Sequence, residues 1–359
     1  MKRTLQLLIM TFAALVLLDV MVAFTLKELK ERGRVASLTN YFDLGRSVPT
    51  KIAEWRDNPT MPGNMLSVAW LDDIAQTSAE KFANNGEEQA PTIRNYGMSF
   101  SERVGRRVIG QDPRFRLDLH GGPAASANHS YAIFDADHQN RRAGDVVLFG
   151  VLSSSVPYLT TMSNRTWSFE QPSPFTYPKY ELVNGALTPI KPQVASQEDQ
   201  EGLASSNALA QAWRAQLRQE DFFYSDLTFA APWLDYSPFA KLVRRALVLR
   251  VLEDKRARVL SGEVYPIKAV LLEILRDVSE KAKADGQYPV IFLIQTGDRR
   301  DVNLRELLVQ DLTDLGIPYV ATEDFVDSSD PANFESDGHF SAEADEIFAA
   351  AVLRLVNTD

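Results

Sequence analysis

The chain has 359 residues, of which 45% are hydrophobic and 24% charged, a composition typical of globular proteins and long enough for about two domains. Its formal net charge of −10 argues against a nucleic-acid-binding protein, because that class needs a basic surface facing the phosphates. The chain contains no cysteine, which excludes disulfides, thiol catalysis and cysteine-ligated zinc but is compatible with every compartment.

The chain begins with an apolar segment. Residues 5–24 are interrupted only by Gln6, Thr11 and Asp19, and a helix of this length matches a bilayer core of about 30 Å. No small-x-small cleavage site follows, so we expect residues 1–26 to form an uncleaved transmembrane anchor, with a cleaved signal peptide as the alternative. Basic residues flank both ends, so their count does not decide the orientation. We expect a single-pass membrane protein whose main domain is extracytoplasmic, in the periplasm.

A spacer is predicted between this segment and the first motif that carries chemistry. Residues 27–34 alternate Lys, Glu and Arg, and residues 41–58 have the apolar spacing of an amphipathic helix. Neither stretch suggests a reaction. We therefore assign residues 27–90 to a juxtamembrane helical spacer that packs on the main domain, and residues 91–359 to that domain.

A serine follows the first predicted strand of the main domain. Residues 91–96 have a strand pattern, and Gly97-Met98-Ser99-Phe100-Ser101 leads into a helix from about Glu102. A serine at a helix N-terminus lies near backbone N–H groups and the positive end of the helix dipole, which favours a nucleophile. The run from Ser99 to Glu102 also fits a capping box, which needs no catalysis.

Two further predicted strands end in polar or glycine-rich turns. The possible strand 115–119 is followed by His120-Gly121-Gly122-Pro123, and a buried strand from Asp145 ends in Val151-Leu152-Ser153. Between them, a predicted helix over 127–141 carries Asn128 in its first turn. We expect His129 and His138 on that helix to be packing or surface histidines.

The segment after the third strand departs from the alternation of strands and helices. Residues 166–194 are rich in proline and aromatic residues, and Asn184-Gly185 predicts a type I′ hairpin turn. Helices are predicted over 197–220 and 238–258. We interpret about 160–262 as an insertion that covers the substrate site as a lid or wall. Its aromatic residues suit sugar stacking if exposed, but in a hairpin they more often belong to a core.

The last part of the chain returns to the alternating pattern. Helices are predicted over 267–284 and 301–315, and strands over 289–295 and 316–321. A loop with Asp337-Gly338-His339 then precedes a final helix capped by Ser341. Histidine is the side chain best suited to move protons near neutral pH. An Asp-Gly turn with a solvated histidine is the alternative for this loop.

Alternating strands and helices predict an α/β protein, a three-layer α/β/α sandwich around a mostly parallel sheet. Such sheets bind ligands at the carboxyl ends of their strands. Ser99, Ser153 and the pair Asp337 and His339 all follow predicted strand ends. We therefore expect these side chains to converge at one edge of the sheet.

The serine and histidine motifs together resemble the SGNH hydrolases, the GDSL-type esterases and acyltransferases. That family has Gly-Asp-Ser-x-Ser at the end of its first strand, and an Asp and a His a few residues apart before its final helix. Gly97 to Ser101 and the pair Asp337 and His339 match these blocks in the same order. Two departures stand out: Met98 replaces the usual Asp, and the Asp–His spacing is two residues where three is commonest.

The resemblance implies an SGNH-type, flavodoxin-like fold and a Ser-His-Asp triad. Ser99 would attack an acyl ester, His339 would take its proton, and Asp337 would orient the imidazole. The substrate would be an acyl ester, for instance an acetyl ester of a cell-surface polysaccharide, and water or a sugar hydroxyl would accept the acyl group. The resemblance requires neither a metal nor a cofactor.

The resemblance also implies donors for the oxyanion. Backbone N–H groups of Ser99 and Gly122 would supply two of them. Ser153 stands where the family has an Asn, so Ser153 or, as a substitute, Asn128 would supply the third. Met98 and Ser153 favour an alternative of another class, a catalytically silent binding or scaffold protein of a polysaccharide assembly with the same fold.

Overall fold

The main body is built on a sheet of five parallel strands, seen in a computed structural model that describes residues 2–32, 42, 48–61, 64–84, 90–170, 172–229, 236–298 and 300–357. The strands are β1 (Thr92–Gly97), β2 (Arg116–Gly121), β3 (Val146–Leu152), β6 (Tyr288–Ile294) and β7 (Tyr319–Ala321). Their order in the sheet is β2-β1-β3-β6-β7, and each neighbouring pair is parallel. The predicted α/β class with a mostly parallel sheet is therefore confirmed.

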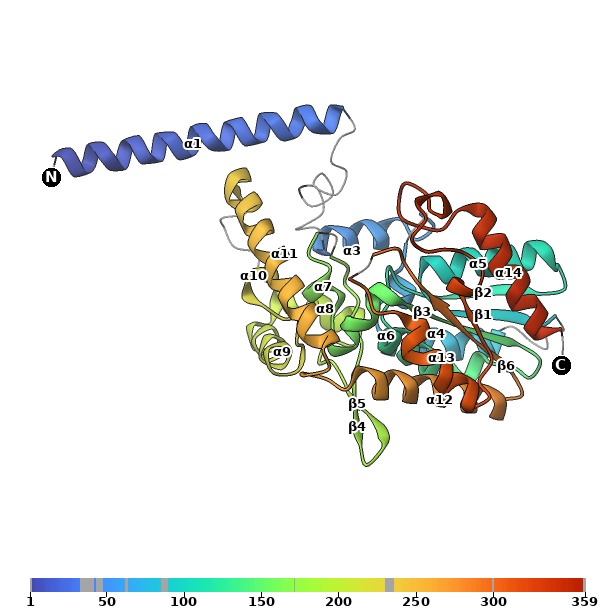
Figure 1. Cartoon of the computed structure of the whole chain (residues 1–359). Helices are drawn as coiled ribbons and strands as arrows, with labels where there is room; N and C mark the ends of the chain where they lie inside the picture. The colour runs from blue at the N-terminus through green and yellow to red at the C-terminus, as the bar shows by residue number, and fades with distance from the viewer. Residues whose placement is uncertain are drawn as a thin grey trace.

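Helices cover both faces of this sheet (Figure 1). β3 is buried along its whole length, as expected for an apolar strand covered on both sides. Its odd-numbered residues pack in one core with α6 (Ala127–Ala136), α12 (Ile267–Ala284) and α13 (Leu304–Asp314). Its even-numbered apolar residues pack in a second core with α5 (Ser99–Gln111) and α14 (Ala342–Val356). The sheet thus lies between two helical layers.

The spacer region packs on the main body. It contains α3 (Val48–Asp57), the 3₁₀ turn η1 (Leu66–Val68) and α4 (Leu71–Asn84). Ile52 and Trp55 of α3 are buried, and α4 packs against α6. The helix predicted over 41–58 is described from Val48 onward; residues 43–47 lie outside the described part of the chain.

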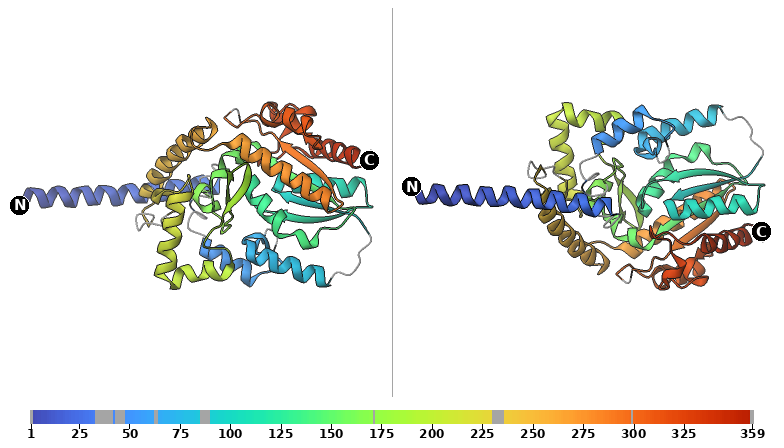
Figure 2. Two further views of the ribbon diagram at one scale, coloured as in Figure 1. Left: turned by 90° about the horizontal axis from the view of Figure 1, so that it is seen from below. Right: turned by 90° about the horizontal axis from the view of Figure 1, so that it is seen from above.

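The first helix, α1 (Lys2–Glu31), projects away from the main body (Figures 1 and 2). Within the described residues, Arg3–Glu31 is the helix long and apolar enough to cross a membrane, and none of its most apolar window is buried by the protein. A signal sequence has the same features. The apolar helix is therefore confirmed, and the uncleaved anchor stays a prediction.

The segment between β3 and β6 forms a hairpin and several helices. In chain order these are η3 (Ser153–Thr160), α7 (Asn164–Trp167), β4 (Lys179–Val183), β5 (Ala186–Ile190), α8 (Gln197–Ser205), α9 (Asn207–Glu220), α10 (Asp226–Phe229) and α11 (Pro238–Leu260). The hairpin turn has positive φ at Asn184 and Gly185, as a type I′ turn requires, so this prediction is confirmed. The helix predicted over 197–220 is interrupted at Ser206, which caps α9.

The aromatic side chains of this segment are mostly core residues. Phe175 and Tyr177 are buried in a cluster with Ile52, Trp70 and Trp213, which joins the segment to the spacer. The interpretation of these aromatic residues as core is therefore the correct one.

The carboxyl ends of the parallel strands share one edge of the sheet. At this edge β1 runs into α5, β2 into the loop before α6, and β3 into η3. The loop that precedes α14, which includes the 3₁₀ turn η6 (Pro331–Asn333), carries Asp337 and His339. The remaining short turns are η2 (His138–Asn140), which follows the early end of α6 at Ala136, and η5 (Thr322–Asp324) after β7.

Candidate active site

Ser99 is the first residue of α5, directly after the end of β1. The N-cap is Met98, whose backbone N–H donates to the Ser101 hydroxyl at 3.1 Å. The capping box predicted from Ser99 to Glu102 is therefore wrong, because the helix begins one residue earlier. Because Ser99 is not the N-cap residue, its hydroxyl makes no capping hydrogen bond. Met98, at the position where SGNH hydrolases have Asp, is 2% exposed and packs in the core under α5.

His339 meets Ser99 across 240 positions of sequence. The Nε2 atom of His339 lies 2.7 Å from the Ser99 hydroxyl oxygen, which is hydrogen-bond distance. A short turn aims the imidazole: Phe334 and Phe340 pair as a β-bridge, and Gly338 has a φ of +88° that favours glycine. The backbone N–H of Glu335 also donates to the His339 carbonyl at 2.7 Å. The predicted convergence of the serine and histidine motifs is present.

Asp337 lies on the far side of the imidazole from Ser99. Its Oδ2 is 3.1 Å from His339 Nδ1, and its Oδ1 accepts the backbone N–H of His339 at 3.1 Å. Those His339 contacts lower the pKa of the Asp337 carboxyl, so it is ionised at neutral pH. Among the described residues, however, Nδ1 has no partner with the alignment of a hydrogen bond. We therefore treat the Asp337–His339 side-chain contact as a close polar contact rather than an aligned hydrogen bond, made by a carboxylate that is 60% exposed.

The position of the carboxylate still decides the tautomer of the imidazole. A carboxylate beside Nδ1 favours the proton on that nitrogen, which leaves Nε2 free to accept the proton of Ser99. The ring of Phe100 lies against the imidazole with 4.6 Å between centroids and limits its rotation. The histidine is thus arranged as a general base for the serine.

Arg103 ties the histidine loop to the helix that carries the serine. Its guanidinium donates to both oxygens of Glu335, at 2.6 and 3.0 Å, and to Asp345 of α14 at 2.8 Å. This pairing lowers the pKa of the Glu335 carboxyl. Sequence reasoning missed these residues. The available signal was an arginine four positions after Ser99 and an acid four positions before His339.

Gly122 lies beside the start of α5. β1 and β2 pair with Gly97 opposite Gly121, so the residues that follow the two strands are neighbours at the carboxyl edge. A Cβ atom on Gly122 would lie 2.9 Å from the ring of His129, which packs behind this loop. The first N–H groups of an α-helix have no partner within the helix. The N–H groups of Ser99 and Gly122 therefore remain the candidates for an oxyanion site.

Gly121 offers a test of how closely these two strand ends approach. A Cβ atom on Gly121 would lie 2.1 Å from the carbonyl oxygen of Gly97, and backbone cannot move aside as a side chain can. We expect Gly121→Ala to lower the free energy of unfolding by more than about 2 kcal/mol. Denaturant unfolding of the protein in detergent measures it. Gly110→Ala is the matched control, because nothing lies within 4 Å of its Cβ and alanine favours a helix by about 1 kcal/mol. Equal effects of the two substitutions would contradict the close approach.

Ser153 does not meet the other predicted site residues. Its hydroxyl lies 3.1 Å from the Thr296 hydroxyl and 3.3 Å from Asp301, and it accepts the backbone N–H of Thr296 at 3.1 Å. Asp301 is in turn paired with Arg256 of α11. Ser153 therefore belongs to a polar network at the ends of β3 and β6, and its hydroxyl is engaged there.

Asn128 does not fit its predicted role as an oxyanion donor. It is completely buried, and its amide donates to the backbone carbonyls of Thr161 at 3.1 Å and Pro178 at 3.0 Å. Both hydrogens of the amide are thereby used. These hydrogen bonds satisfy two backbone carbonyls that would be costly to bury unpaired, and they tie α6 to the segment after η3.

The other histidines do not contribute to the site. His129 is buried and stacks on Tyr177, and burial lowers its pKa to about 4. His138 is exposed, with Nδ1 3.2 Å from the Asp135 carbonyl. The prediction that these two are packing and surface histidines is confirmed.

His120 lies in a buried cluster of charged groups. Its Nε2 is 2.9 Å from Asp118 and 3.3 Å from Asp137, and within the described residues these three are the group whose ligand atoms converge as a metal site would need. Arg94 already donates to Asp118 at 3.0 Å, and the Tyr96 hydroxyl donates to Asp137 at 2.8 Å. Each of the two carboxylates already accepts a hydrogen bond from another side chain. We therefore interpret this cluster as a structural network that stabilises the edge of the sheet.

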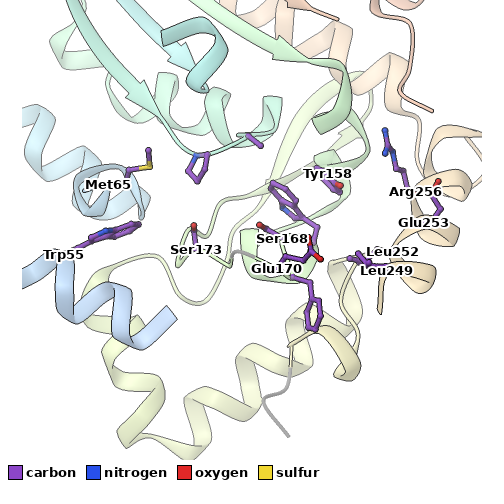
Figure 3. A pocket seen from close by; sticks show the side chains of 14 residues that line it. Trp55, Met65, Tyr158, Ser168, Glu170, Ser173, Leu249, Leu252, Glu253 and Arg256 are labelled. Carbon is purple, nitrogen blue, oxygen red and sulfur yellow. The ribbon is translucent and has the colours of Figure 1, made fainter. Parts of the chain in front are cut away.

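A cavity of about 590 Å³ lies near the loop that follows Gly122 (Figure 3). Pro123 and Ala124 of that loop line it, together with residues 167–170 and the second half of α11. Figure 3 shows Trp55 and Met65 on one side and Glu253 and Arg256 on the other. Ser99 and His339 are not among its lining residues. The segment after β3 therefore reaches the carboxyl edge and walls a cavity beside the site.

No protein-family model matches the chain, and no curated protein matches it.

Proposed function

We propose that this protein is a membrane-anchored serine esterase or O-acyltransferase of SGNH type. Its substrate is an acyl ester, most simply an acetyl ester of a cell-surface polysaccharide, and its main domain faces the periplasm. Ser99 is the nucleophile, His339 the general base and Asp337 the group that orients the base. Reaction with a fluorophosphonate, which labels activated serines, tests the proposal directly.

The contact between Ser99 and His339 carries this proposal. The two residues come from opposite ends of the main domain, yet Nε2 and Oγ lie 2.7 Å apart. A serine with an imidazole at hydrogen-bond distance, and a carboxylate at the other ring nitrogen, is the arrangement that activates a serine for acyl transfer.

The proposed reaction proceeds in two halves. Ser99 Oγ attacks the ester carbonyl carbon while its proton moves to His339 Nε2, and the imidazolium then gives that proton to the departing alkoxide. The products are a free alcohol and acyl-Ser99. In the second half, water or a sugar hydroxyl loses a proton to His339 and attacks the acyl carbon, which releases Ser99. The N–H groups of Ser99 and Gly122 stabilise the oxyanion in both halves.

The segment between β3 and β6 is proposed to act as the insertion that shapes the substrate site. Its residues 167–170 and α11 wall the cavity next to Pro123, one residue beyond the proposed oxyanion donor Gly122. A polysaccharide chain needs an extended surface rather than a closed pocket, and a wall beside the loop that follows Gly122 can supply it. Because Phe175 and Tyr177 are buried, residues other than these two aromatics would contact a sugar.

A catalytically silent scaffold is the second candidate. Three observations favour it: the Asp337 carboxylate is largely exposed, the Ser153 hydroxyl is engaged with Thr296 and Asp301, and the Asn128 amide is engaged with backbone carbonyls. An oxyanion site with only backbone donors would be weaker than one with a side-chain amide as well. The two candidates differ in whether Ser99 reacts with an activated phosphonate.

Asp337→Asn is expected to slow the reaction only about tenfold. Two unit charges 3.1 Å apart interact by roughly 1.3 kcal/mol in water, and a carboxylate this exposed is screened close to that limit. The rate of fluorophosphonate labelling measures the effect. Glu343→Gln on α14 is the control, since it removes an exposed carboxylate near the same loop. A loss of a thousandfold or more would show that the carboxylate acts in a dry, aligned triad.

A further inference from the structure

The first half of α11 is polar on its buried side and apolar on its exposed side. Lys241 and Arg244 are only 5% and 9% exposed, whereas Val243 and Leu247 are 44% and 51% exposed. A helix on the surface of a water-soluble protein has the opposite arrangement, with its apolar stripe facing the core. Val243, Ala246 and Leu247 follow helical spacing, so they form one continuous exposed face.

The basic side chains of this half are bonded inward. Lys241 donates to the carbonyl of Phe42 at 3.0 Å, and Arg244 donates to the carbonyl of Leu227 at 2.8 Å. Arg245 pairs with Glu170. The protein therefore directs these charges away from the exposed face, which leaves that face apolar.

The start of α11 is bonded to the apolar segment of α1. Asp19 accepts hydrogen bonds from the Ser237 hydroxyl at 2.7 Å and from the backbone N–H of Phe239 at 2.9 Å. A carboxylate in an apolar span is costly unless it has such partners, and the N-terminus of a helix is a favourable one. Asp19 lies five residues before Phe24, the end of the apolar segment, which corresponds to about 7.5 Å along the helix. The first turn of α11 thus lies at the depth of Asp19, inside the apolar segment.

A groove joins the apolar faces of the two helices. It has a volume of about 800 Å³, and most of its lining is apolar, including Phe12, Leu15 and Val16 of α1 and Val243 and Leu247 of α11. The charged residues in its lining are Asp19, Arg244 and Asp226. Figure 1 shows the start of α11 beneath α1, on the side of the body from which α1 projects. The exposed face of α11 is therefore continuous with the surface that a bilayer would cover if α1 crosses it.

We infer that the first half of α11, residues 238–247, is embedded in the same bilayer as α1, with phospholipid acyl chains filling the groove between the two helices. Lipid on the exposed side of α11 accounts for three features. The apolar face points outward, the basic groups point inward, and Asp19 is paired with the start of α11. A second copy of the chain bound to this face would account for the exposure of Val243 and Leu247. It would not explain why Phe12 and its neighbours on α1 extend the same apolar surface. The inference does not depend on esterase activity.

Site-directed labelling tests the inference, because the natural chain has no cysteine that would react with the label. Val243→Cys and Leu247→Cys are labelled with an environment-sensitive fluorophore, and the full chain is reconstituted in phosphatidylcholine vesicles. Ile347→Cys on α14 is the matched control, since Ile347 is also an exposed apolar residue at 42% and lies on the main body. Ala246→Cys serves as a further probe of the same face where loss of the valine or leucine side chain impairs folding.

Quenching by nitroxide-labelled lipid and by aqueous iodide distinguishes the outcomes. We expect lipid to quench the labels at 243 and 247 at least several-fold more than the label at 347, and iodide to show the reverse order. Iodide quenching at 243, 246 and 247 equal to that at 347 would overturn the inference, because the face would then contact water. Protection from both quenchers would also overturn it, because a protein surface would then cover the face.

Discussion

Ser99→Ala is expected to abolish covalent labelling by a fluorophosphonate and to lower hydrolysis of a chromogenic acetyl ester by about a thousandfold or more. The physical reason is that the hydroxyl of Ser99 forms the bond to the acyl carbon. Ser101, the nearest serine on α5, is fully buried and has its hydroxyl bonded to the Met98 carbonyl at 2.9 Å. No neighbouring serine can therefore replace the lost nucleophile.

The measurement is the rate of labelling of the full-length protein in detergent, followed by identification of the labelled residue. Ser205→Ala is the control, because it removes a hydroxyl from an exposed helix end in α8 and should be labelled at the wild-type rate. Thermal unfolding of both variants verifies that the fold is intact. Wild-type protein that remains unlabelled would favour the silent scaffold, and Ser99→Ala that is still labelled would assign the nucleophile to another residue.

The part of the site that could be predicted from sequence depends on strand topology. β3 and β6 are continuous apolar runs, which are typical of buried parallel strands, and parallel strands carry their carboxyl ends to one edge. That rule places the residues after β1 and those after β7 at the same edge, and Ser99 does meet His339 there. Because β3 and β6 lie between the two strands in the sheet, the contact also depends on the long loop before α14, which the rule does not predict. The start of α5 could not be predicted in the same way, because Ser99 and Glu102 fit a capping box whereas Met98, the actual N-cap, makes no side-chain capping hydrogen bond. Only the backbone shows that the helix begins at Ser99.

The third oxyanion donor, assigned to Ser153 or Asn128, could not be judged from sequence because the partners of a buried polar group are remote in sequence. The amide of Asn128 is bonded to carbonyls 33 and 50 positions away, and the hydroxyl of Ser153 lies near groups 143 and 148 positions away. No local pattern reports such contacts. The same reason applies to α11: residues 238–258 mix basic and apolar residues in helical spacing, and the exposed side is known only once the buried side is known.

His339→Ala is expected to cost nearly as much as Ser99→Ala. The imidazole both removes the proton of Ser99 and returns it to the leaving group, and the two residues act as one unit, so their effects are not additive. The double variant should therefore be no slower in ester hydrolysis than Ser99→Ala alone.

Added imidazole separates a chemical role of His339 from a structural one. The side chain of His339 is 23% exposed, so its removal opens a site that a free imidazole can reach from solvent. Imidazole should restore part of the labelling rate of His339→Ala and none of that of Ser99→Ala. Phe100→Leu is the matched control, since it alters packing against the ring but keeps the base. If His339→Ala is labelled as fast as the wild-type protein, the 2.7 Å contact between Ser99 and His339 is structural, and His339 is not the base that activates Ser99.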